Sequence, residues 1–288
     1  MRTLVVLATL VAQATFASRT VVVVVPVSVN GAGGRAITGL SKEQFHVYDD
    51  GRPQVITTFA RGDAAVTLGL VVDRSASMRQ KLSIVTDAIA RFARSARATD
   101  ELFVVNFNEK VSRSIFTSGP FTSDATELQA AVAGVRAAGT TALYDAVMDA
   151  MRHLSLGTAV RKALIVISDG ADNASRNSYQ NTAALVREVG AVVYTIGLSV
   201  DPKDRHSNDE LGRLARDSGG SAFVLRTVDE ISTVLDEVVR DMRDQYLLGF
   251  IPEQARSSGL IRVTADVPGQ VKVTVRSRSS YTLPVSVP

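Results

Sequence analysis

The chain contains no cysteine. This absence excludes disulfide bonds, thiolate metal sites and cysteine nucleophiles. Long runs of like charge are absent too, and the net charge of +3 is spread over interspersed basic and acidic residues. Nucleic-acid binding needs basic residues concentrated on one face, and the densest group, Arg91, Arg94 and Arg97, has the spacing of a solvated helix face. We therefore expect no nucleic-acid partner.

The composition is that of a folded protein. Hydrophobic residues make up 45% and charged residues 21% of the 288 residues, so a packed core is expected. The length exceeds that of one typical domain. We therefore expect one principal domain and a smaller one.

The N-terminus has the pattern of a short secretory signal peptide. A basic start at residues 1–3 is followed by an apolar stretch at 4–11 and by two segments, 12–14 and 15–17, whose small residues suit signal peptidase. A buried first strand is the alternative interpretation. A membrane span is not expected, because the apolar stretch is well short of the roughly 20 residues that cross a bilayer. We predict that residues 1–17 are a signal peptide and that the mature protein is secreted or extracytoplasmic, in the periplasm or at the cell surface.

Residues 63–245 alternate between strand-like and helix-like patterns, which predicts an α/β sheet with right-handed connections. The predicted strands are 67–72, 101–107, 113–116, 162–168, 191–196 and 222–225. The predicted helices are 79–97, 126–135, 143–154, 182–189, 210–217 and 228–243. The link between the second and third strands is too short for a crossover helix, so these two strands must be antiparallel. The prediction is a doubly wound, mostly parallel six-stranded sheet with one antiparallel edge strand.

The flanking segments, 18–62 and 246–288, have β patterns. The predicted N-terminal strands are 20–29, a strand containing Phe45 and Val47, and a second hairpin arm at 54–59 after the Asp50-Gly51 turn. The predicted C-terminal strands are 246–250, 260–265 and 271–275. Because an isolated hairpin is only marginally stable, we expect the two segments to pair in one small β domain. Two separate β extensions are the alternative.

Oxygen-bearing side chains gather where predicted strands end. An Asp-x-Ser-x-Ser motif follows the first strand of the α/β region, a Gly-Thr-Thr loop precedes its third helix, and Ser-Asp-Gly ends its fourth strand. Ligands of an open parallel sheet bind beyond the carboxyl ends of its strands, and Mg²⁺ prefers oxygen ligands. Asp-x-Ser-x-Ser alone is also typical of a helix N-cap, but the three elements together predict a metal site. Its candidate residues are Asp73, Ser75, Ser77, Thr141 and Asp169.

These elements, in this order, resemble the metal-ion-dependent adhesion site of the von Willebrand factor A (VWA) domain, and the resemblance covers residues 65–244. It implies that the hydroxyls of Ser75, Ser77 and Thr141 coordinate a cation directly, and that the two carboxylates do so directly or through water. The ion implied is Mg²⁺, with Mn²⁺ or Ca²⁺ as alternatives. The stretch 39–51, Gly-Leu-Ser-Lys-Glu-Gln-Phe followed by Tyr-Asp-Asp-Gly, is similar to the leader of secreted bacterial VWA proteins of the acidobacterial type.

Further polar residues lie near this site in the sequence. Asp145 either supports the metal ligands or, as we expect, favours the start of its helix through the macrodipole. Asp172 and Asn173 either rim the site or simply build their loop, which is commoner for these residue types. The polar segment 199–208 is expected to be a solvated loop rather than one that selects partners.

Enzyme activity is not expected. No Gly-x-Ser-x-Gly elbow, Walker loop or His-Glu-x-x-His motif occurs. A haloacid-dehalogenase-like phosphotransferase needs a second Asp as its acid/base, and Ser75 stands at that position. The three histidines, His46, His153 and His206, lie outside all motifs, and we expect them at the surface.

The resemblance implies a secreted, divalent-cation-dependent binding module of the adhesive kind. With only two carboxylates among its ligands, the cation would favour an anionic oxygen, so the expected partner is a protein that offers an Asp or Glu. The alternative is a structural or scaffold protein whose metal stabilises the fold and whose β domain makes the contacts. The sequence leaves the oligomeric state open.

Overall fold

The computed structural model describes residues 21–62, 64–134, 136–198, 205–252, 257–270 and 272–283. The predicted signal peptide lies outside the described residues, and so do residues 199–204 of the predicted polar loop. Within the described part of the chain, no helix is long and apolar enough to cross a membrane.

A six-stranded sheet forms the centre of the larger unit, with the strand order β10-β9-β8-β5-β6-β7. Neighbouring strands are parallel, except that β7 is antiparallel to β6. The predicted mostly parallel sheet with one antiparallel edge strand is thus confirmed. Its strands are β5 (Val66–Asp73), β6 (Glu101–Phe107), β7 (Val111–Arg113), β8 (Arg161–Ser168), β9 (Val192–Gly197) and β10 (Ala222–Val224).

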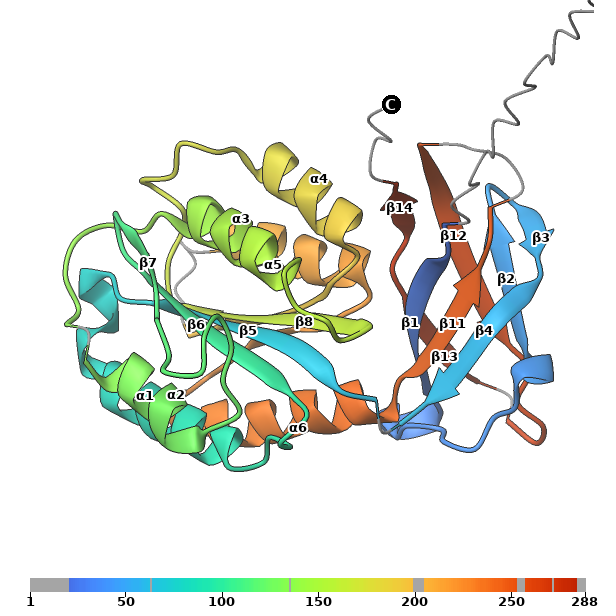
Figure 1. Cartoon of the computed structure of the whole chain (residues 1–288), viewed down its shortest axis with the longest axis horizontal. Coiled ribbons are helices and arrows are strands. Elements are labelled where there is room, and N and C mark those ends of the chain that lie inside the picture. The colour runs from blue at the N-terminus through green and yellow to red at the C-terminus, as the bar shows by residue number, and fades with distance from the viewer. Residues whose placement is uncertain are drawn as a thin grey trace, which may run out of the picture.

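Helices cover both faces of this sheet (Figure 1). α1 packs against α2 and α6 on one face, while α4 packs against α3 and α5 on the other. Because both faces are covered, β5 and β8 are buried almost throughout, as their continuous apolar runs predict. The helices are α1 (Leu82–Ala93), α2 (Ala125–Ala133), α3 (Leu143–Leu154), α4 (Tyr179–Val189), α5 (Arg205–Ser218) and α6 (Ile231–Asp244).

Several predicted boundaries in this unit were wrong, including those of β7, α1 and α5. β7 was predicted at 113–116 but spans Val111–Arg113, because Lys110 N donates to Asn108 Oδ1 in a tight turn that returns the chain at once. The first helix was predicted at 79–97, but a short 3-10 helix occupies Ala76–Gln80 and α1 ends at Ala93. α5 begins at Arg205, five residues before the predicted start at 210, because its first turns are polar and carry no apolar periodicity.

The flanking segments form two four-stranded antiparallel sheets, ordered β13-β1-β11-β4 and β14-β12-β2-β3. Each sheet combines strands from both ends of the chain, since β1 pairs with β11 and β2 pairs with β12. That the two sheets fold as a domain of their own stays a prediction. Their strands are β1 (Val23–Asn30), β2 (Phe45–Asp49), β3 (Arg52–Gln54), β4 (Ile56–Arg61), β11 (Tyr246–Phe250), β12 (Ser258–Ala265), β13 (Thr274–Ser277) and β14 (Ser280–Thr282).

The hairpin arm predicted at 54–59 is divided between the two sheets. β3 pairs with β2, whereas β4 pairs with β11 in the other sheet. The chain changes sheets at Val55, whose side chain is 79% exposed. From Ile56 onward the strand contributes to a core shared by both sheets, where Phe45, Phe59 and Tyr246 pack ring against ring. Val55 and Ile56 are both apolar and β-branched, so their residue types suit one continuous strand and do not reveal the change of sheet.

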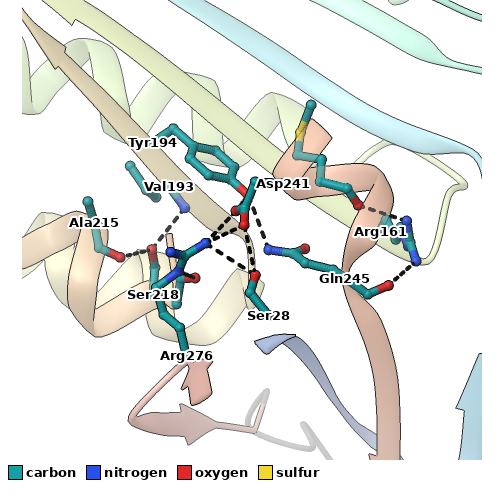
Figure 2. Close-up of polar contacts among 11 residues, drawn as sticks. Ser28, Arg161, Val193, Tyr194, Ala215, Ser218, Asp241, Gln245 and Arg276 are labelled. Atoms are coloured by element: carbon teal, nitrogen blue, oxygen red, sulfur yellow. Dashed lines mark hydrogen bonds and ion pairs between the residues drawn. The ribbon is translucent and has the colours of Figure 1, made fainter. Parts of the chain in front are cut away.

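A polar network joins the two units at the amino ends of the parallel strands (Figure 2). Asp241 of α6 accepts hydrogen bonds from Arg276 of β13 at 2.5 Å, from Tyr194 of β9 at 2.7 Å and from Ser28 of β1 at 3.1 Å. Burial, together with the Asp241 carboxylate, holds the pKa of Tyr194 well above its usual value, so its hydroxyl remains a donor.

Arg161 ties down both connections between the units. Its guanidinium donates to the carbonyl oxygens of Gly62 at 2.9 Å, Met242 at 2.9 Å and Gln245 at 2.7 Å. The first carbonyl precedes β5, and the other two lie where α6 leads into β11. The larger unit is therefore held on the smaller one at the end of its sheet opposite to the carboxyl ends of the strands.

Candidate metal centre

Two adjacent parallel strands bring the predicted carboxylates together. Asp73 is the last residue of β5, and Asp169 directly follows Ser168, the last residue of β8. The strands pair in register up to Val72 and Ile167. The two carboxylates therefore leave the sheet side by side at its carboxyl edge, as the sequence predicts.

Asp73 is completely buried and is held by two hydrogen bonds. Its Oδ1 accepts from the backbone N–H of Ser75 at 2.7 Å, and its Oδ2 accepts from the hydroxyl of Ser168 at 2.6 Å. Burial raises the pKa of Asp73 above its usual value, although the hydrogen bonds from Ser168 and Ser75 oppose this shift; the nearby Asp169 carboxylate adds to it. Sequence reasoning missed the part played by Ser168, whose signal was its position directly before Asp169.

The two serines of the motif connect the strands. The hydroxyl oxygens of Ser75 and Ser77 lie 3.0 Å apart, and Ser77 Oγ donates to Asp169 Oδ1 at 2.7 Å. The other carboxylate oxygen, Asp169 Oδ2, forms an ion pair with the ammonium of Lys81. Lys81 was not predicted as part of the site, because a lysine before an amphipathic helix resembles any solvated residue.

Thr141 reaches the site from a loop that is fixed on both sides. Ala76 N donates to Gly139 O at 3.1 Å, and Thr141 N donates to Asn173 Oδ1 at 2.8 Å. A Cβ atom added at Gly170 would lie 3.8 Å from Thr141 Oγ1, which places this hydroxyl beside the loop that follows β8.

The neighbouring threonine is differently placed. Thr141 is buried and only 4% exposed, whereas Thr140 is exposed and its backbone N–H contacts Glu109 Oε2 at 3.3 Å. The structure therefore brings all five predicted residues to one edge of the sheet, and it distinguishes Thr141 from Thr140.

Asp145 secures the loop after β8. Its carboxylate accepts from the backbone N–H groups of Arg176 and Asn177 at 3.0 Å each, and from Asn177 Nδ2 at 2.7 Å. Burial would raise the pKa of Asp145, but these hydrogen bonds outweigh it and hold the pKa below its usual value. Asp145 thus supports the surroundings of the site through this loop.

Asp172 and Asn173 lie in the loop after β8 and bind the backbone at and just before the start of α3. Asp172 Oδ1 accepts from Leu143 N at 2.8 Å and from the Ser175 hydroxyl at 2.5 Å, so it satisfies a backbone donor at the start of α3. Asn173 both accepts from Thr141 N and donates its own backbone N–H to Thr141 O at 3.0 Å. These residues build the loop, as expected, and through it they hold Thr141.

Arg74, inside the Asp-x-Ser-x-Ser motif, is another residue whose role was not predicted from the sequence. Its side chain is 1% exposed and donates to Asn106 Oδ1 at 2.9 Å and to the carbonyl of Val132 near the end of α2. Burial lowers the pKa of Arg74 to about 10. The arginine thus anchors the motif to the helix layer beneath it.

The expectation that all three histidines lie at the surface was wrong for His153. It is 7% exposed on α3, packs on the rings of Phe103 and Phe121, and has its two ring nitrogens 2.8 Å from Pro120 O and Arg113 Nη1. A histidine with both nitrogens satisfied is compatible with a buried helix face. His46 is exposed, and the side chain of His206 lies outside the described part.

The donor set fits a hard divalent cation. All five candidate side chains offer oxygen, which suits Mg²⁺, Mn²⁺ or Ca²⁺. In the described residues no group of three or more His, Cys, Asp or Glu side chains could hold a metal, so a site here depends on the hydroxyls. A nitrogen- or sulfur-rich site of the structural zinc type has no counterpart in these residues.

Comparison with known proteins identifies the family. The sequence pattern described as "von Willebrand factor type A domain" matches residues 68–237. A sequence comparison with curated proteins finds no match.

Solved structures share the fold at low sequence identity. A von Willebrand factor type A protein from Catenulispora acidiphila has a TM-score of 0.55 and 13% identity, covering 94% of this chain and 76% of that chain. The vWF domain of the type V pili tip protein Mfa5 from Porphyromonas gingivalis has a TM-score of 0.53 and 15% identity, covering 63% and 95%. Proximal thread matrix protein 1 from the mussel byssus, with a zinc-occupied MIDAS motif, has a TM-score of 0.54 and 17% identity, covering 73% and 50%.

Proposed function

The chain belongs to the von Willebrand factor type A domain family, and we propose that it is a secreted, divalent-cation-dependent module that binds an Asp or Glu of a partner protein. One observation carries this proposal: Ser75, Ser77 and Asp169 form a continuous chain of polar contacts between two adjacent strand ends. Hydroxyl and carboxylate oxygens that already converge need little rearrangement to surround one ion.

The charge of the donor set explains the choice of partner. A bound divalent cation would supply an open coordination position for an anionic oxygen. Asp73 and Asp169 carry the only two negative charges among the five candidates, and the hydroxyls of Ser75, Ser77 and Thr141 are neutral. Because neutral donors leave the cation electrophilic, a carboxylate of a partner is the best matched ligand.

The relatives support this proposal. The mussel byssus protein holds zinc in its MIDAS motif, and the Mfa5 domain belongs to a pilus tip protein. We propose Mg²⁺ as the ion of this chain, since oxygen donors alone suit it, with Mn²⁺ and Ca²⁺ as alternatives. The signal-like pattern of residues 1–17 supports an extracytoplasmic location.

The test compares two adjacent threonines. Partners are captured from the native source on immobilised protein in Mg²⁺ and again after chelation. Thr141→Val keeps the side-chain size and deletes one oxygen, so cation-dependent capture should fall sharply, whereas Thr140→Val should capture as the wild type does. Equal loss in both variants, or in neither, contradicts the proposed role of Thr141.

The scaffold function is the second candidate, because the network around Asp241 and Arg276 joins the β strands to the α/β unit. Chelation separates the two functions. If chelation releases the partner while the fold persists, the metal site makes the contact; if the partner stays bound after chelation, the β strands make it.

A further inference from the structure

We propose that Lys81 is the internal counter-ion of the metal centre, and that a divalent cation must displace its ammonium group from Asp169. The inference rests on the cation binding proposed above and adds a residue that sets the affinity of that site. Lys81 lies between the 3-10 helix Ala76–Gln80 and α1, and its Nζ pairs with Asp169 Oδ2.

The burial of Asp169 makes its charge depend on this ion pair. The Asp169 side chain is 1% exposed, so its charge is costly without a partner. The neutral hydroxyl of Ser77 donates a hydrogen bond to Asp169 Oδ1, and the positively charged ammonium of Lys81 donates to Asp169 Oδ2. The ammonium therefore balances the carboxylate that we propose as a metal ligand.

A cation and the ammonium cannot both stay beside this oxygen without a cost. Two positive charges about 4 Å apart repel strongly when they are partly shielded from water. The Lys81 side chain is 28% exposed and ends a flexible four-carbon stem, so it can move into solvent. Cation binding is therefore an exchange of one positive group for another, which lowers the apparent affinity.

Two other positive groups near the motif do not take this role. Arg74 is directed to Asn106 and to the Val132 carbonyl, and it is nearly inaccessible to solvent. Arg79 lies in the same 3-10 helix as Ser77 but is exposed. Lys81, by contrast, forms an ion pair with a proposed ligand, and the exposed Arg79 offers a matched control.

The experiment titrates Mn²⁺ into chelator-treated full-length protein by calorimetry and measures the thermal midpoint without metal. Lys81→Met should lower the dissociation constant for Mn²⁺ about tenfold or more, because the repulsion is removed. The same variant without metal should melt below the wild type, because Asp169 loses its counter-ion. Lys81→Arg and Arg79→Met should each bind Mn²⁺ within about twofold of the wild type.

The outcomes separate this inference from the proposed function. If Lys81→Met binds Mn²⁺ as the wild type does, or more weakly, Lys81 does not compete with the cation and the inference is overturned. If the wild type and every variant fail to bind Mn²⁺, the proposed function and this inference are refuted together. Lys81→Gln replaces Lys81→Met if that variant fails to fold, with the same expected result.

Discussion

The junction between the two units should depend strongly on one carboxylate, which Asp241→Asn tests. The substitution keeps the side-chain volume and removes the charge that faces Arg276. The hydroxyls of Tyr194 and Ser28 then have only the amide oxygen of the new asparagine as acceptor, which is weaker than a carboxylate. The NH₂ group of that amide faces groups that are themselves hydrogen-bond donors.

The expected loss can be worked out from these contacts. Breaking a fully buried ion pair costs about 3–5 kcal/mol, but the side chains of Arg276 and Asp241 are 25% and 17% exposed, which weakens the pair. We therefore expect Asp241→Asn to lower the free energy of unfolding by about 2–3 kcal/mol. Urea denaturation followed by circular dichroism measures this loss.

A matched control lies on the same helix. Asp236 is on the exposed face of α6, and Asp236→Asn should change the free energy of unfolding by less than about 0.5 kcal/mol. Combining Asp241→Asn with Arg276→Met should cost clearly less than the sum of the single losses, because the two side chains act as a pair. A loss below about 0.5 kcal/mol for Asp241→Asn would refute the reasoning.

Two further predictions concern the loops that hold the site. Gly139→Ala should destabilise the protein by about 1–2 kcal/mol, because φ at this glycine is +78°, a conformation that is strained for a residue with a Cβ, whereas the exposed Glu109 side chain can move away from the new Cβ; a urea midpoint unchanged from the wild type would contradict this. Asp145→Asn should be less stable than the wild type at pH 6. Because folding depresses the pKa of Asp145, its stabilisation is present above the ordinary aspartate pKa of 3.8 and is lost as pH falls through the folded pKa, so the difference should shrink in acid. A difference that stays constant from pH 6 to pH 3 would show that the charge of Asp145 is unimportant.

The larger unit could be predicted from the sequence because its signals are local. The apolar runs of β5 and β8 end in carboxylates, and parallel strands bring such ends to one edge. The short turn at Asn108 required an antiparallel β7. Each of these inferences depends on residues close together in the chain.

What the sequence could not predict depends on contacts between distant residues. Lys81 pairs with Asp169, which lies 88 positions later in the sequence, and no motif around either residue predicts this ion pair. Val55 looks like one more residue of a strand, although the chain changes sheets there. His153 is buried because Arg113 and Pro120 satisfy its ring nitrogens, and these partners are 40 and 33 positions away.

Binding of a divalent cation to the predicted donors is the central claim, and calorimetric titration of Mg²⁺ or Mn²⁺ into the wild type and Asp73→Asn tests it most directly. The wild type should show one saturable site, and at a free cation concentration 100 times the dissociation constant its stability should rise by about 2.7 kcal/mol. Asp73→Asn should bind at least about tenfold more weakly, since it removes one of the two ligand charges. No saturable binding by the wild type, or equal binding by both proteins, would contradict the account.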